Sequence, residues 1–139
     1  MAVGFRVRSN VWVVGSQDFL NAFFSTISAN REPDGWGTRF PALQNELYAG
    51  RLAADDVPAA LSELKAIRDE LKSLSPDDVV WDAEDLDRRP PWGDDISPEI
   101  TDLSNYFVTQ DGRDLVEVLS EALAYAQRSG ADMTIESGV

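Results

Sequence analysis

The residues best suited to chemistry lie in one stretch, residues 90–114, which reads PPWGDDISPEITDLSNYFVTQDGRD. Four acidic residues in it could hold a hard divalent cation through carboxylate oxygens; they are Asp94, Asp95, Glu99 and Asp102. Their spacing does not match a calcium-binding loop, because the glycine and the terminal glutamate do not stand at the required offsets. A carboxylate pair for glycoside hydrolysis is no better supported than in any other acidic chain. The sequence therefore predicts no metal site and no catalytic residue, and a carboxylate-based, metal-dependent enzyme is the least favoured alternative.

Two residue types are missing from the chain, and their absence excludes several classes of site. The chain has no histidine and no cysteine. Nucleophilic catalysis by Ser-His-Asp or Cys-His arrangements is excluded in its usual forms. A zinc site built on imidazole or thiolate ligands is excluded as well. No glycine-rich loop precedes a Lys-Ser or Lys-Thr pair, so the phosphate-binding fingerprint is missing, and no cofactor is expected.

The charge balance is strongly acidic, with 25 acidic against 12 basic residues and a formal net charge of −13. Binding to nucleic acid is disfavoured, because phosphate contacts need clustered lysine and arginine. Binding to an anionic membrane surface is disfavoured for the same reason. An acidic surface keeps a protein soluble, and it also steers a basic partner and speeds its association. The sequence leaves both interpretations open.

The N-terminal residues MAVGFRVRSN lack the long apolar core of a signal peptide. No run approaches the roughly 20 apolar residues of a membrane span. The absence of cysteine fits a reducing compartment. We therefore expect a cytoplasmic protein.

The length of 139 residues predicts one domain over residues 1–139, and 43% apolar residues are enough for a sizeable core. Apolar side chains at helical spacing predict three main helices, near residues 16–29, 56–74 and 114–128. A shorter helix is expected after Pro41, closed by Gly50, with an extended segment as the alternative.

Strands are predicted where β-branched and aromatic residues gather. Residues 5–13 form either one strand or a hairpin that turns at Ser9-Asn10, and short strands are expected at residues 79–81, 106–108 and 133–135. The predicted fold is α+β, with a small, mostly antiparallel sheet packed by the three helices.

Two motifs, PPWG at residues 90–93 and TDLSNYF at residues 101–107, follow the run GWGTRFPALQNELYAGRL. Together they resemble a family of bacterial immunity proteins from polymorphic-toxin systems, immunity protein family seventy. The resemblance covers most of the chain, from the N-terminal strand through the last helix. It implies a small cytoplasmic antidote that binds the C-terminal domain of a cognate toxin and blocks it without catalysis. Many effector toxins are basic nucleases, and an acidic antidote can occupy the surface that nucleic acid would use. A non-catalytic adaptor with another partner is the alternative.

The resemblance carries over no site residues, so the expected interface rests on the chemistry of this sequence. Proline and glycine around Trp92 fix the backbone, which lowers the entropy lost on binding. Tryptophan is enriched in the residues that dominate binding energy, and acidic neighbours would attract a basic toxin. We predict an interface made by Trp92, Asp94, Asp95, Glu99 and Asp102. The competing interpretation is that Trp92 only covers the core.

Overall fold

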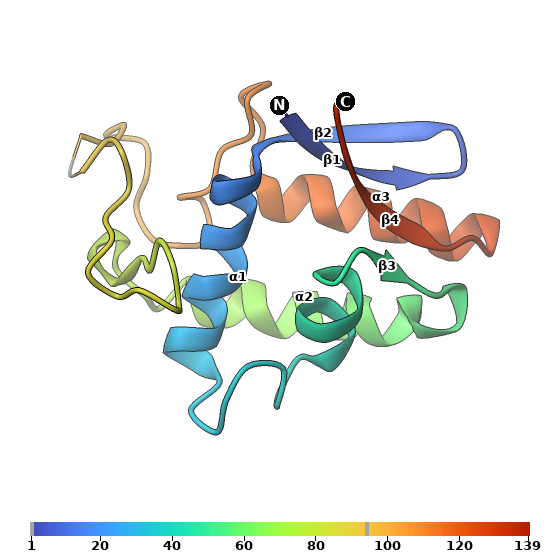
Figure 1. Ribbon diagram of the computed structural model, residues 1–139, viewed down its shortest axis with the longest axis horizontal. Helices are drawn as coiled ribbons and strands as arrows, with labels where there is room; N and C mark the ends of the chain where they lie inside the picture. The colour runs from blue at the N-terminus through green and yellow to red at the C-terminus, as the bar shows by residue number, and fades with distance from the viewer. Residues whose placement is uncertain (1, 94) are drawn as a thin grey trace.

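The computed structural model describes residues 2–93 and 95–139 and contains one antiparallel sheet with three long helices (Figure 1). The four strands lie in the order β2-β1-β4-β3; their bounds are β1 Ala2–Val7, β2 Asn10–Ser16, β3 Arg51–Leu52 and β4 Met133–Ser137. The helices are α1 Gln17–Arg31, α2 Val57–Leu71 and α3 Leu115–Ser129. This arrangement confirms the predicted α+β class, the three main helices and the last strand.

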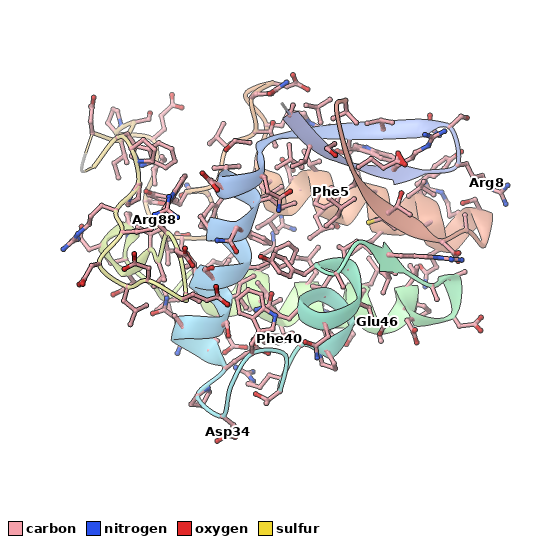
Figure 2. The ribbon with its side chains drawn as sticks, in the orientation of Figure 1. Phe5, Arg8, Asp34, Phe40, Glu46 and Arg88 are labelled. Carbon is pink, nitrogen blue, oxygen red and sulfur yellow. The ribbon has the colours of Figure 1, made fainter. Side chains whose placement is uncertain are left out.

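The N-terminal segment is a hairpin, so the second of the two interpretations is confirmed. Val7 pairs with Asn10 in the β1–β2 register, which places the turn at Arg8 and Ser9, one residue earlier than expected. Arg8 has a φ of 55°, the left-handed conformation that two-residue hairpin turns require. Phe5 on β1 is fully buried and lies in the interior between the sheet and the helices (Figure 2).

The long helices begin and end at residues that satisfy their free backbone groups. The Ser16 hydroxyl accepts a hydrogen bond from Phe19 N at 3.1 Å and begins α1. The Asp114 carboxylate accepts one from Val116 N at 3.0 Å and begins α3. Gly130 ends α3 in the left-handed conformation, with a φ of 63°. Helix α3 lies between the β1–β2 hairpin and α2 (Figure 1).

The short segment between α1 and α2 forms a π-helix, η1, at Ala42–Leu47. Pro41 stands at its N-cap, so the predicted short helix is confirmed and the extended alternative is wrong. The Glu63 carboxylate of α2 accepts hydrogen bonds from Ala42 N at 3.1 Å and Leu43 N at 3.0 Å. Burial raises the pKa of Glu63 above its ordinary value even though these two hydrogen bonds lower it.

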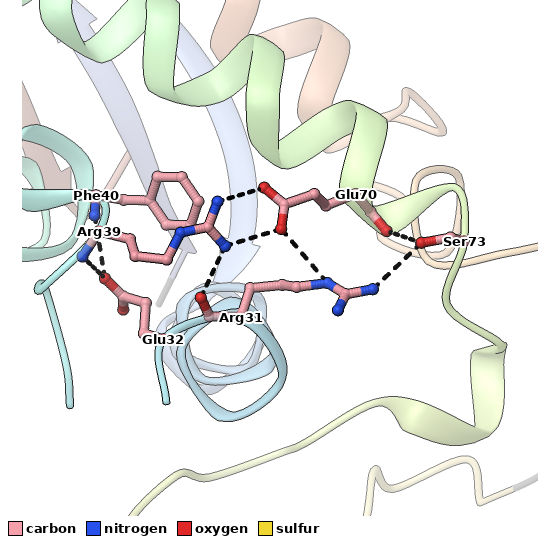
Figure 3. Close-up of polar contacts among 6 residues, drawn as sticks. All are labelled: Arg31, Glu32, Arg39, Phe40, Glu70 and Ser73. Carbon is pink, nitrogen blue, oxygen red and sulfur yellow. Dashed lines mark hydrogen bonds and ion pairs between the residues drawn. The ribbon is translucent and has the colours of Figure 1, made fainter. Parts of the chain in front are cut away.

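A second polar network holds the loop after α1 against α2 (Figure 3). The Arg39 guanidinium donates two hydrogen bonds to the Glu70 carboxylate, each at 2.8 Å. Arg31 Nε lies 3.6 Å from the same carboxylate. Glu32, which is buried, accepts hydrogen bonds from Arg39 N and Phe40 N, each at 3.1 Å. These contacts join the C-terminus of α1, the loop and α2.

Two predicted strands do not form, because their backbone groups bond to partners other than a neighbouring strand. In residues 79–81, Val80 N donates to the Thr26 hydroxyl at 3.0 Å, and the same hydroxyl donates to Val80 O at 3.1 Å. In residues 106–108, only an isolated bridge from Val108 to Asp114 is present. There the chain turns into α3 through the hydrogen bond from Leu115 N to Phe107 O, at 2.8 Å.

Candidate functional site

Residues 77–102, which we call the acidic segment, carry the densest negative charge in the chain. They hold ten of the 25 acidic residues but only two of the 12 basic ones, a net charge of −8 out of −13. The segment runs from α2 toward α3 as turns and irregular loops and projects beside α1, drawn in yellow-green and yellow in Figure 1. Arg88, one of its two basic residues, is labelled there in Figure 2.

Polar side chains of α1 hold the start of the acidic segment. Besides the two Thr26–Val80 hydrogen bonds, Asn30 Nδ2 donates to Asp78 O at 2.9 Å. Just beyond the end of the segment, Leu103 N donates to Leu74 O at 3.1 Å. Both ends are therefore tied to the helical part of the fold, and the charged residues between them are presented on an anchored loop.

Trp92 packs against an aromatic cluster and also reaches solvent. Its ring meets Trp81 edge-on, with centroids 5.4 Å apart, and lies 6.3 Å from Tyr106. Its indole Nε1 donates a hydrogen bond to the Tyr106 hydroxyl at 2.8 Å. Trp81 and Tyr106 are buried, whereas Trp92 is 36% exposed. The same side chain therefore covers the core with part of its surface and leaves the rest exposed to solvent.

The carboxylates of Asp95 and Glu99 are exposed, and no hydrogen bond or ion pair engages them within the described part of the chain. Asp95 N donates to Trp92 O at 3.0 Å, so Asp95 belongs to the turn that carries the tryptophan. Glu99 O accepts a hydrogen bond from Asn105 Nδ2 at 3.3 Å. Both residues therefore stand on turns held by hydrogen bonds, with their carboxylates exposed to solvent.

Asp102 differs from Asp95 and Glu99, because its carboxylate already accepts hydrogen bonds within the protein. It accepts hydrogen bonds from Ser104 N at 2.7 Å, from the Ser104 hydroxyl and from the Thr101 hydroxyl at 3.2 Å. Burial opposes its ionisation, yet these hydrogen bonds hold the pKa of Asp102 below its ordinary value. Asp102 N and Glu99 O both contact the Asn105 side chain, which brings these two residues together. Asp94 lies outside the described residues.

A hollow of about 640 Å³ lies on the acidic segment and was not predicted from the sequence. Apolar and charged side chains both line it; they include Val79, Val80, Leu86, Pro90, Ile96, Arg88, Arg89 and Asp77. Leu86 is 71% exposed, the highest value among the large apolar side chains that the structure describes. The sequence carried one signal for this hollow, a leucine isolated within the charged run DAEDLDRR.

We expect thermal melts with and without a chelator to coincide. The chain has no histidine or cysteine to offer a metal, and within residues 2–93 and 95–139 no three acidic side chains gather closely enough to hold an ion. The measurement is the melting temperature in EDTA and in EDTA already saturated with calcium. The second condition has a similar ionic strength but no free chelator, so a difference between the two reports chelation. A clear fall in EDTA alone would indicate a metal site that contributes to stability.

A match to a protein family confirms the resemblance drawn from the PPWG and TDLSNYF motifs. A family model described as Immunity protein 70 matches residues 5–135. No curated protein and no solved structure matches the chain. None of the helices in the described ranges is both long enough and apolar enough to cross a membrane.

Proposed function

This chain belongs to the immunity protein 70 family, and we propose that it neutralises one cognate toxin by binding the C-terminal domain of that toxin directly. In this proposal the whole chain acts as one domain in the cytoplasm and performs no catalysis of its own. The observation that supports this mode of action most strongly is the structure of the acidic segment. It is an anchored loop on which the exposed carboxylates of Asp95 and Glu99 make no hydrogen bond or ion pair to the described residues, and they lie beside the partly exposed side chain of Trp92.

The anchoring of the acidic segment favours binding, because a loop that is already ordered loses little entropy on association. Gly93 N donates to Pro90 O at 2.9 Å and Asp95 N to Trp92 O at 3.0 Å, so the turn around Trp92 is held by its own backbone. A partly exposed tryptophan on such a turn has the side-chain type and the rigidity of residues that dominate binding energy.

The charge of the acidic segment indicates the kind of surface that it would cover. A net charge of −8 within 26 residues attracts a basic surface over several ångströms and speeds encounter with it. A toxin that acts on nucleic acid needs such a basic surface for its phosphate contacts. We therefore propose a nuclease domain as the target, blocked because the acidic segment occupies the surface on which the nucleic acid would lie.

Reversing two charges of the acidic segment tests this proposal. We expect Asp95→Lys with Glu99→Lys to leave the melting temperature unchanged, since both carboxylates are exposed and unengaged. The association rate with a catalytically inactive form of the cognate toxin domain should fall by roughly tenfold at low salt. The measurement is association kinetics against ionic strength, and the variant should show a shallower salt dependence than the parent.

Asp34→Lys with Asp111→Lys is the matched control, because it makes the same charge change at two exposed residues outside the acidic segment. Asp34 lies in the loop after α1, well away from Arg88 in Figure 2. This control should slow association much less. Equal rates and equal salt slopes for the Asp95/Glu99 variant and the parent would place the toxin interface elsewhere on the molecule.

A further inference from the structure

A second hollow, of about 490 Å³, lies where α1 meets the start of the acidic segment, and none of its lining residues belongs to the predicted interface. We call it the α1 hollow. Its walls come from α1, from the loop after α1, from the residue after η1 and from the acidic segment; they are Gln17, Asp18, Asn21, Ser25, Trp36, Tyr48, Asp82, Ala83 and Glu84. In Figure 1, α1 runs between the acidic segment and η1, so this face of α1 is flanked on both sides.

The α1 hollow is negatively charged. Asp18, Asp82 and Glu84 line it, and none of its lining residues is lysine or arginine. Asp82 Oδ2 accepts a hydrogen bond from Arg88 at 3.2 Å, whereas Asp18 and Glu84 have no side-chain hydrogen bond or ion pair within the described residues. Burial, and then the negative charges of Glu84 and Asp82, raise the pKa of the Tyr48 hydroxyl above its ordinary value. The field inside the hollow therefore favours a positive charge.

Two aromatic rings in the wall are fixed by hydrogen bonds. The Trp36 and Tyr48 rings have their centroids 5.1 Å apart at an angle of 56°. Trp36 Nε1 donates to Gln44 O at 2.8 Å, and the Tyr48 hydroxyl donates to Asn21 Oδ1 at 2.7 Å. Their polar atoms are thus bonded within the protein. Aromatic faces attract cations, and a guanidinium also stacks on them, so these rings add to the attraction of the carboxylates.

A buried hydroxyl in the wall has no partner. Ser25 on α1 is fully buried and lines the hollow, yet its Oγ makes no hydrogen bond to any described residue. A buried polar atom without a partner costs free energy, so such atoms are rare in native proteins. An N–H group that entered the hollow would supply the missing partner, because a serine hydroxyl accepts as well as donates.

We propose that the α1 hollow receives one cationic side chain, an arginine or a lysine, from the bound toxin domain. The inference rests on the proposed function, since the toxin supplies the cation. The planar guanidinium of arginine meets all three features at once: it pairs with Asp18 and Glu84, it stacks on an aromatic ring, and it can donate to Ser25. Anionic ligands are repelled, and a bare metal ion finds no group of three or more acidic side chains in the described residues.

The first test uses small probes and does not need the toxin. N-acetyl-arginine amide and N-acetyl-lysine amide are titrated into the full chain, with the neutral N-acetyl-citrulline amide as control, while backbone amide resonances are followed by NMR. We expect weak, saturable shifts centred on Asn21, Ser25, Tyr48 and Ala83, with arginine tighter than lysine and with no saturable shift for citrulline. Equal shifts for arginine and citrulline, or shifts elsewhere only, would overturn the proposal.

The matched variants are Asp18→Asn with Glu84→Gln in the hollow, and Asp95→Asn with Glu99→Gln outside it. Each removes two exposed acidic charges with little change of shape. The hollow variant should bind the arginine probe about fivefold more weakly, since each exposed charge pair contributes modestly. The outer variant should bind this probe like the parent. An equal loss in both variants would show a general charge effect and would overturn the assignment of the hollow.

The second test uses a catalytically inactive form of the cognate toxin domain. The hollow variant should dissociate faster from it than the parent, whereas the outer variant should mainly associate more slowly. If the parent binds and the hollow variant binds equally well, the hollow proposal fails and the proposed function stands. If the parent does not bind, the proposed function fails, and with it the toxin as the source of the cation.

Discussion

Leu119→Ala is expected to lower the free energy of unfolding by about 2–5 kcal/mol. Leu119 lies in the middle of α3 and is fully buried, and α3 packs against both β1 and α2. Truncation removes buried methyl groups and leaves a cavity that the surrounding elements only partly fill. Leu64, on α2, is 3% exposed, and its replacement by alanine should fall in the same range. The measurement is chemical denaturation followed by circular dichroism.

The control for this prediction is Leu86→Ala. Leu86 is 71% exposed on the acidic segment, so the same substitution there should change stability by less than about 0.5 kcal/mol. An unchanged denaturation midpoint for Leu119→Ala would mean that α3 does not pack as described. A loss as large for Leu86 as for Leu119 would mean that the Leu86 side chain is packed into the core and not exposed as described.

The parts of the fold that sequence could predict are those fixed by neighbouring residues. The N-cap at Ser16 and the left-handed C-cap at Gly130 stand next to the helices that they bound. The apolar spacing in a helix predicts its buried face, and the buried residues of α2 and α3 follow that spacing. Such signals act over one or two helical turns, so a single sequence contains them.

The strand predicted at residues 79–81 shows where local signals are not enough. Val79, Val80 and Trp81 have the side chains of a buried strand, and Trp81 is indeed buried. Whether they form a strand depends on what bonds to their backbone, and that partner is Thr26, 54 residues earlier. A threonine in the middle of a helix gives no sign that it will bond to a distant loop.

The candidate binding residues also fall into two groups, those that the sequence could predict and those that only the fold brings together. Trp92, Asp95 and Glu99 could be proposed from one stretch, because glycine, proline and acidic residues there indicate an exposed, rigid turn. The α1 hollow could not be predicted from the sequence, because its walls come from four separate segments between Gln17 and Glu84. In the sequence, Trp36 belonged to a loop and Tyr48 to a short helix, and only the fold brings them beside the carboxylates.

Glu32→Gln is the second substitution with a large expected effect. The Glu32 side chain is buried and accepts hydrogen bonds from Arg39 N, Phe40 N and Gln44 Nε2, at 3.0–3.1 Å. Glutamine has nearly the same shape but only one acceptor oxygen. Its amide NH₂ group would face N–H donors of the protein in place of the second carboxylate oxygen. We expect a loss of about 1–3 kcal/mol at neutral pH, the usual cost of leaving buried hydrogen-bonding groups without a partner.

The pH dependence of this stability loss shows whether the charge of the Glu32 carboxylate or only the shape of its side chain stabilises the fold. Burial favours the protonated form of Glu32, yet the hydrogen bonds from Gly37, Gln44, Arg39 and Phe40 outweigh it and lower its pKa below the ordinary 4.5. Stability from a carboxyl whose pKa is lower in the native state is fully present above the unfolded-state pKa. It is lost as the pH falls through the native pKa. The difference in stability between parent and variant should therefore be constant near neutral pH and shrink below about 4.5.

Urea denaturation of both proteins between pH 7 and pH 3 measures this difference directly, because the other carboxyl groups titrate in both and largely cancel. Glu99→Gln serves as control, since the Glu99 carboxylate is exposed and unengaged, and its difference from the parent should stay near zero throughout. A Glu32→Gln loss that did not change with pH would show that shape alone, and not the ionised carboxylate, holds the loop after α1 against α2. The expected decrease of the stability difference at low pH would instead show that the negative charge of Glu32 holds this loop in place.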